Sequence, residues 1–137
     1  MKTSKIIPND NYANAILLSI ALLGVLLAFC RLFDNNFWGD ECYSILLNEK
    51  GYLEIFTYEG ENDVHPPLYH LISKFLCDVF GYADWVYHLS SFIPFTALII
   101  LTVTIFKKDF GFEPTLVLLI CLVVMPSSVK YSVEVRM

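Results

Sequence analysis

Residues 15–30 form the continuous apolar run AILLSIALLGVLLAFC, which carries no charged side chain. Extended to residues 13–33, it has the roughly 20 residues that a helix needs to cross the ~30 Å hydrocarbon core of a bilayer. Tyr12 before the run and Trp38 after it suit the aromatic belts at the two membrane surfaces. Because no small-residue cleavage site follows, we predict an uncleaved membrane span rather than a signal peptide.

Two later apolar stretches predict further spans at 85–106 and 114–131. A fourth stretch, 67–80, is shorter and is interrupted by three titratable side chains, His70, Lys74 and Asp78. It suits an amphipathic helix at the membrane surface better than a span. We therefore predict an all-α membrane protein with about three transmembrane helices and interfacial helices in the first loop.

The basic residues predict how these spans are oriented. Lys2 and Lys5 place the N-terminus in the cytoplasm by the positive-inside rule. Three spans then place Lys107 and Lys108 in the cytoplasm as well, where the rule favours them. Residues 34–84 consequently form an extracytoplasmic loop of a multi-pass protein of the cell membrane.

Composition agrees with this class of protein. The chain has 137 residues, of which 56% are hydrophobic and 17% charged, and its formal net charge is −5. A soluble domain of this size needs no three apolar runs of bilayer length. Acidic residues gather in 34–63 and no basic patch is present, which argues against a nucleic-acid partner.

Two adjacent acids, Asp40 and Glu41, follow the first predicted span and the aromatic pair Phe37-Trp38. A carboxylate at this position could act as a general base that deprotonates an acceptor hydroxyl. The alternative is structural, with Asp40 serving as the N-cap of the following helix.

Three further groups suit substrate binding. Asp63 and His65 precede two prolines that would hold them rigidly at the membrane surface, although a solvated His before a Pro-initiated helix is the alternative. Arg136, beyond the third predicted span, suits a phosphate by its planar guanidinium, or else it simply extends to the interface. His88, near the outer end of the second span, is a weaker candidate because a lone interfacial His is more often structural.

Together and in this order, these motifs resemble glycosyltransferase family 39, the dolichyl-phosphate-mannose–protein mannosyltransferases and their bacterial relatives, including the lipid A aminoarabinose transferases. The resemblance extends from about residue 9 to the end of the chain. It rests on Trp38-Gly39-Asp40-Glu41, Asp63-Val64-His65-Pro66-Pro67-Leu68-Tyr69, Gly81, Ser90-Ser91, Pro126 and the stretch 131–137.

The resemblance implies the N-terminal part of a GT-C transmembrane domain, with the active site on the extracytoplasmic face. It implies transfer of a sugar from a polyprenyl-phosphate-linked donor to a hydroxyl of a protein, lipid or glycan acceptor, with inversion of the anomeric centre. Asp40 matches the family's first-loop Asp and Glu41 its partner acid. Asp63 and His65 match the second-loop motif, and Arg136 a basic residue at the outer end of the third span.

The sequence departs from the family in two respects. His88 stands where the family often has Arg, and the chain is much shorter than family members. We therefore expect a truncated fragment that is inactive by itself. No ligand cluster demands a divalent metal, and the cofactor stays open.

The rival hypothesis is a non-catalytic small membrane protein that binds a partner or lipid through residues 67–80. A transporter is disfavoured because the spans are nearly free of charge.

Overall fold

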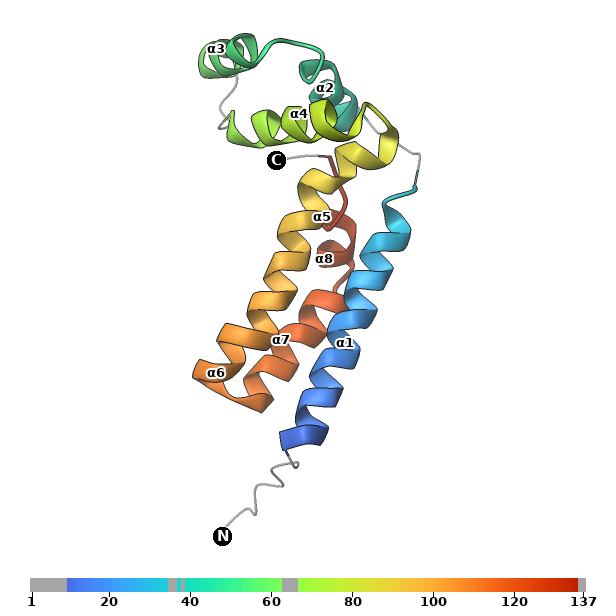
Figure 1. The fold of residues 1–137 in the computed structure, drawn as a ribbon, viewed down its shortest axis with the longest axis vertical. Coiled ribbons are helices and arrows are strands. Elements are labelled where there is room, and N and C mark those ends of the chain that lie inside the picture. The colour runs from blue at the N-terminus through green and yellow to red at the C-terminus, as the bar shows by residue number, and fades with distance from the viewer. Residues whose placement is uncertain (1–9, 35–36, 38, 63–66, 136–137) are drawn as a thin grey trace.

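A long apolar helix, α1 (Asp10–Arg31), runs along one side of the helical bundle in the computed structural model (Figure 1). The structure describes residues 10–34, 37, 39–62 and 67–135, except for the side chains at 40 and 58–62. Within these ranges every regular element is a helix, which confirms the all-α class. The 22 residues of α1 give a length of ~33 Å, matching the predicted first span.

A second long helix lies beside α1 and corresponds to the second predicted span. It comprises α5 (Asp84–Leu101), a π-helical turn η1 (Thr102–Phe106) and α6 (Lys107–Phe110). Helices 10–31 and 84–110 are both long and apolar enough to cross a membrane, which is consistent with a helical membrane protein. Pro94 lies within α5 without ending it.

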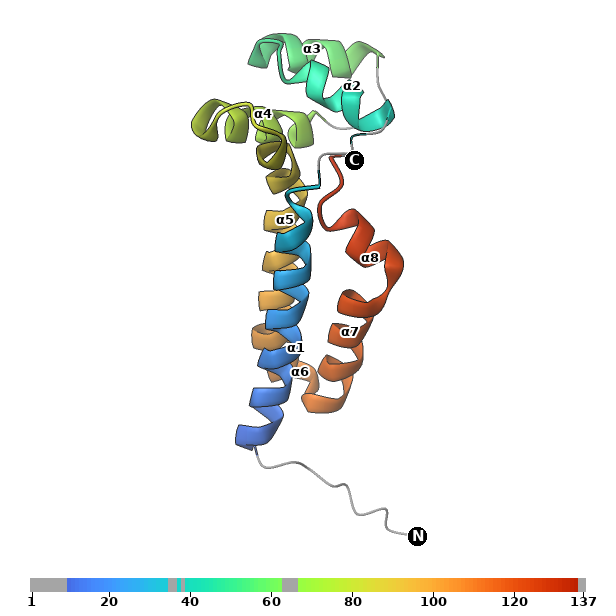
Figure 2. The same cartoon turned by 90° about the vertical axis from the view of Figure 1, so that its right-hand side faces the viewer.

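The third predicted span, 114–131, is divided in the structure. α7 (Phe112–Val124) ends at Met125, and α8 (Pro126–Tyr131) starts a new direction (Figure 2). Pro126 lacks an N–H and disfavours helical backbone in the residue before it, and Met125 is accordingly extended with ψ 125°. The 13 residues of α7 reach only ~20 Å, so a crossing by this stretch stays a prediction.

The bundle is held together by a face of small residues on α1, which packs on α5 and α7. The buried positions follow helical spacing: Ala13, Leu17, Ala21, Gly24 and Ala28. On the opposite face large apolar side chains are exposed, among them Leu18, Leu22, Leu26 and Phe29. Small residues let helix backbones approach closely, and an apolar outer face suits a lipid environment.

Three shorter helices lie across one end of the bundle, at the opposite end from the start of α1 (Figures 1 and 2). They are α2 (Gly39–Leu47), α3 (Tyr52–Asn62) and α4 (Leu68–Phe80). α4 packs on the start of α5, and α3 packs on α4. The helix predicted at 67–80 is therefore confirmed as a helix that lies across the long ones.

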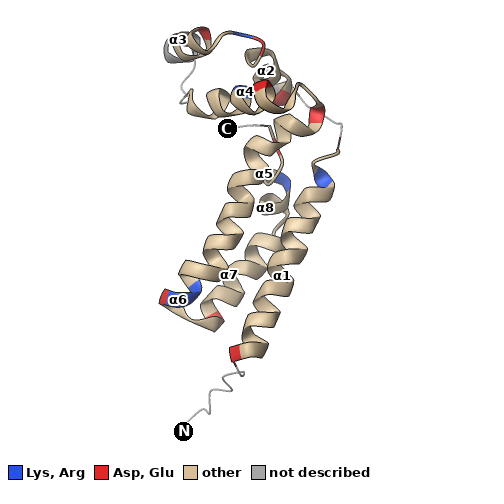
Figure 3. Ribbon diagram, in the orientation of Figure 1, with Lys and Arg blue, Asp and Glu red and all other residues tan. Residues whose placement is uncertain are grey.

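Charged residues concentrate at the two ends of the bundle and leave its middle apolar (Figure 3). At the end where α1 begins, Lys107 Nζ donates a hydrogen bond to Asn14 Oδ1. At the other end lie Arg31, Lys130 and the acids of the crossing helices. This distribution leaves a central apolar zone between two polar ends, as a membrane-spanning bundle requires.

The packing of α7 on Gly24 of α1 predicts a sensitive position. A Cβ added at Gly24 would lie 2.6 Å from Val123 Cγ2 and 3.2 Å from Ile99 Cδ1, so in Gly24→Ala either the Val123 side chain or the two helices must shift. We expect the free energy of unfolding to fall by about 1–3 kcal/mol, the range typical of overpacked cores. Detergent-titrated unfolding followed by tryptophan fluorescence measures the change. Gly51→Ala is the matched control, because an added Cβ there meets nothing within 4 Å; equal stability of the two variants would contradict this packing.

Candidate functional site

Two of the six predicted site residues have described side chains, Glu41 and His88. Asp40 lies in the first turn of α2, where only its backbone is described. Asp63, His65 and Arg136 lie outside the described residues, so their roles stay predictions.

Glu41 joins the first turn of α2 to the end of the described chain. Its side chain is only 4% exposed, and its Oε1 accepts a hydrogen bond of 2.9 Å from the backbone N–H of Val135. The partners are 94 residues apart in sequence. The contact therefore brings the first turn of α2, which carries the acid pair, against the segment that follows α8.

His88 lies near the start of α5 and contacts backbone on two sides. Its Nδ1 is 2.6 Å from the carbonyl oxygen of Val133, and its Nε2 is 3.2 Å from that of Asp34. The ring also stacks on Phe37, with centroids 5.1 Å apart. Each nitrogen makes a hydrogen bond only where it carries a proton, because a carbonyl is an acceptor. His88 thus ties three segments together, and a ligand would compete with backbone for its nitrogens.

These residues line a small polar cavity of about 110 Å³ at this end of the bundle. Its walls come from α1, α2, α5, α8 and the segment after α8, and consist of Arg31, Asp34, Glu41, His88, Lys130, Val133 and Glu134. A cavity of this size has room for several water molecules or a small anion. The structure therefore brings both described site residues to one polar cavity.

Two cations in this cavity were not predicted from the sequence. Arg31 Nη1 donates a hydrogen bond of 2.9 Å to the carbonyl oxygen of Val129, which places it beside Lys130 on the cavity wall. Arg31 Nε also lies 3.5 Å from Asp34 Oδ2, an exposed and hence weak ion pair. Each cation ends an apolar run, a position that predicts an interfacial anchor rather than a ligand.

The donor set gives no indication of a resident metal. Within the described ranges, no group of three or more His, Cys, Asp or Glu side chains is placed to hold an ion. Two cations, Arg31 and Lys130, share this cavity with three carboxylates, Asp34, Glu41 and Glu134, and the guanidinium of Arg31 is the lining group best suited to an oxyanion.

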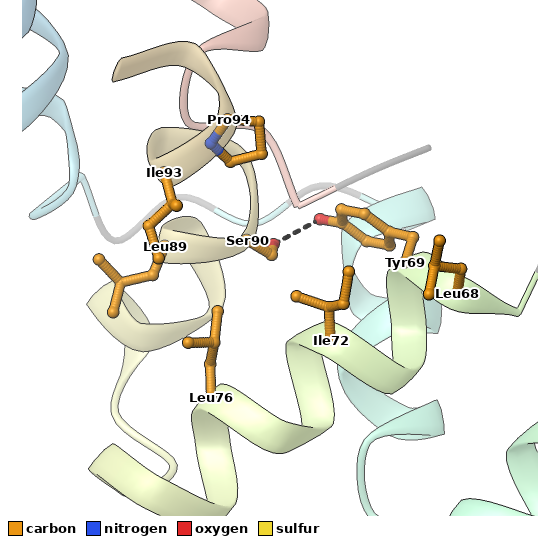
Figure 4. Close-up of a pocket in the computed structure, with 8 residues that line it drawn as sticks. All are labelled: Leu68, Tyr69, Ile72, Leu76, Leu89, Ser90, Ile93 and Pro94. Carbon is orange, nitrogen blue, oxygen red and sulfur yellow. Dashed lines mark hydrogen bonds between the residues drawn. The ribbon is translucent and has the colours of Figure 1, made fainter. Parts of the chain in front are cut away.

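A second, apolar groove of about 480 Å³ lies between α4 and α5 (Figure 4). One wall is formed by Leu68, Ile72 and Leu76, and the other by Leu89, Ile93 and Pro94. At its edge, the hydroxyls of Tyr69 and Ser90 are hydrogen bonded at 2.8 Å. The groove is suited to a hydrocarbon chain.

Comparisons with protein-family models, with curated proteins and with solved structures gave no match to this chain. Fold and geometry therefore carry the functional argument.

The Glu41 contact predicts a measurable local effect. Glu41→Ala leaves the buried Val135 N–H without its acceptor, which costs about 1–3 kcal/mol. We expect faster hydrogen exchange in a peptide that covers 132–135, measured by mass spectrometry. Glu41→Gln keeps an acceptor oxygen and should retain most of the protection. Glu113→Ala, at an exposed position at the other end of the bundle, is the control; unchanged exchange in Glu41→Ala would contradict the contact.

Proposed function

We propose that the chain belongs to a membrane glycosyltransferase that transfers a sugar from a polyprenyl-phosphate-linked donor to an acceptor hydroxyl. The observation that carries the proposal is the polar cavity at one end of the bundle. There Glu41 and His88 lie with two cations, Arg31 and Lys130, contributed by segments far apart in sequence. Acids beside cations at the end of apolar helices suit a reaction on a phosphate held at a membrane surface.

The proposed orientation places this cavity on the extracytoplasmic side. Lys107 and Asn14 are in contact, so Lys107 and Lys108 share one end of the bundle with the start of α1. That end is cytoplasmic by the positive-inside rule. The cavity lies at the opposite end, where the donor's phosphate would meet it at the outer surface.

In the proposed reaction, Asp40 accepts the proton of the acceptor hydroxyl as its oxygen attacks the anomeric carbon. The bond from that carbon to the donor's phosphate oxygen breaks, and the polyprenyl phosphate leaves with the bonding pair. Arg31 and Lys130 stabilise the negative charge on the departing phosphate. Glu41 already accepts a hydrogen bond from Val135, so its proposed role is to hold the start of α2 in place, and Asp40 is the candidate base.

Activity in membranes of cells that express the natural gene tests the proposal. Radiolabelled hexose and aminopentose donors on polyprenyl phosphate are supplied, and transfer to membrane acceptors is measured. We expect Asp40→Asn to reduce kcat by a factor of about 10²–10⁴, the range for loss of a general base. Arg31→Gln should instead raise KM for the donor as well as lower kcat, because it removes a proposed contact with the donor's phosphate.

Lys108→Gln, at the far end of the bundle, is the control that should retain activity. Undiminished turnover in Asp40→Asn would remove this residue from the mechanism. Absence of transfer from every donor in membranes that contain the wild-type protein would contradict the proposed function.

A second candidate function is supported by α4. Its exposed apolar residues, Leu68, Ile72, Phe75 and Val79, form a stripe at helical spacing. The groove in Figure 4 begins at this stripe. A non-catalytic protein could bind a membrane phospholipid here by one acyl chain.

Photocrosslinking with a diazirine-labelled phosphatidylcholine tests lipid binding. Ile72→Asn introduces an amide into the groove wall, and we expect several-fold less labelling because burying an unpaired amide is costly. Val79→Asn changes the same exposed stripe outside the groove and should be labelled as wild type. Equal labelling of both variants would show that the groove holds no acyl chain.

A further inference from the structure

A polar network, buried at its α2 side and exposed at its α3 side, connects α2, α3 and α4 away from the cavity. Its centre is Lys74 of α4, which is only 8% exposed. Asn48, which follows α2, is fully buried, and Ser73 is 1% exposed. A charged side chain is rarely buried unless it is paired, because removal from water is costly. The burial of Lys74 therefore indicates that it is paired with groups on the neighbouring helices.

Lys74 contacts Asn48, which directly follows α2, Tyr52 of α3 and Asp78 of its own helix. Its Nζ donates a hydrogen bond of 3.1 Å to the carbonyl oxygen of Asn48 and lies 3.5 Å from Asp78 Oδ1. Asp78 accepts hydrogen bonds of 2.6 Å from the hydroxyls of Tyr52, the first residue of α3, and Tyr82. The Lys74 ammonium is also 5.3 Å from the centroid of the Tyr52 ring, within the range of a cation–π contact.

A parallel hydrogen bond fixes the same end of α2. Asn48 Nδ2 donates to Ser73 Oγ at 2.8 Å, so both the backbone and the side chain of Asn48 are bound to α4. At the other end of α2, Glu41 is bound to Val135. This nine-residue helix, ~14 Å long, is therefore held at both ends.

We propose that Lys74 is a positioning residue, which sets the angle of α2 over the polar cavity and thereby the place of the Asp40-Glu41 pair. Because α2 is short and stiff, displacement of its C-terminal end moves its N-terminal turn as well. The assignment to catalysis rests on the proposed glycosyltransferase function. The mechanical claim, that Lys74 determines where α2 lies, does not.

The network keeps its protonation state over the physiological range. The hydrogen bond from Tyr52 lowers the pKa of Asp78, so its contribution to stability is present above the ordinary Asp pKa of about 3.9 and is lost as pH falls through the lower folded value. The hydrogen bond to Asp78 raises the pKa of Tyr52 to about 12, so its contribution to stability is fully present below the ordinary Tyr pKa of about 10 and is lost as pH rises through the folded value of about 12. The hydrogen bond between Tyr52 and Asp78 therefore does not respond to pH changes in the physiological range.

Hydrogen exchange of the peptide 39–48 in Lys74→Met tests the mechanical claim in the full chain, reconstituted in lipid nanodiscs. Loss of the donor to the Asn48 carbonyl should raise exchange in α2 roughly tenfold or more, the effect of one charge-assisted hydrogen bond. Lys74→Arg keeps a donor and should recover much of the protection. Lys108→Met, an exposed lysine at the other end, is the matched control.

In the transfer assay, Lys74→Met should lower kcat and leave KM for the donor nearly unchanged, because the acid pair moves while Arg31 and Lys130 do not. Unchanged exchange in α2 would overturn the positioning role, whatever the activity. Transfer that is absent in the wild type would contradict the proposed function and leave the exchange result intact. Should Lys74→Met fail to fold, Asp78→Asn weakens the same network, and wild-type exchange of α2 in that variant would also overturn the proposal.

Discussion

The close approach of α1 to α7 at Gly24 fixes the geometry of the molecule. The side chain of Val123 packs directly on Gly24, where an added Cβ would lie 2.6 Å from Val123 Cγ2. Two turns further along, α1 ends at Arg31, and its guanidinium reaches the carbonyl of Val129 in α8. A glycine in the middle of the bundle is therefore what allows a cation at the end of α1 to line the same cavity as Lys130. Site geometry is in this sense a consequence of helix packing.

The sequence predicted the long helices well because apolar run length is a local property. Helices 10–31 and 84–110 correspond to runs that any bilayer-length criterion finds. The break at Met125 was missed although Pro126 marks it, because a proline near the end of a run is compatible both with a kink and with a new helix. The choice between a kinked helix and a new helix depends on tertiary packing, and the sequence alone does not tell which segments pack against α7 and α8.

Of the residues that line the polar cavity, the sequence analysis singled out Glu41 and His88 but not Arg31 and Lys130. An Arg or Lys at the end of an apolar run has an adequate local explanation as an interfacial anchor, so nothing in the pattern suggests a ligand. Arg31 becomes part of a site only through its contact with Val129, 98 residues away.

For His88, the contacts in the structure differ from the role that the sequence suggested. The motif suggested a substitute for a phosphate-binding Arg, whereas its ring bonds to the carbonyls of Val133 and Asp34. The cations that line the cavity with Glu41 are Arg31 and Lys130 instead.

The polarity of α4 bears on how the crossing helices sit at a membrane. In a soluble protein, the polar face of a surface helix meets water and the apolar face is buried. In α4 this arrangement is partly reversed: His70, Ser73 and Lys74 are buried together with Leu76 and Cys77, while a stripe of large apolar residues is exposed, namely Leu68, Ile72, Phe75 and Val79. Ser73 and Lys74 on this buried face form the hydrogen bonds to Asn48 that hold α2. An exposed apolar stripe of this length is unfavourable in water and favourable against lipid. The same helix therefore provides both the anchor for α2, which carries the acid pair, and an exposed apolar surface suited to lipid.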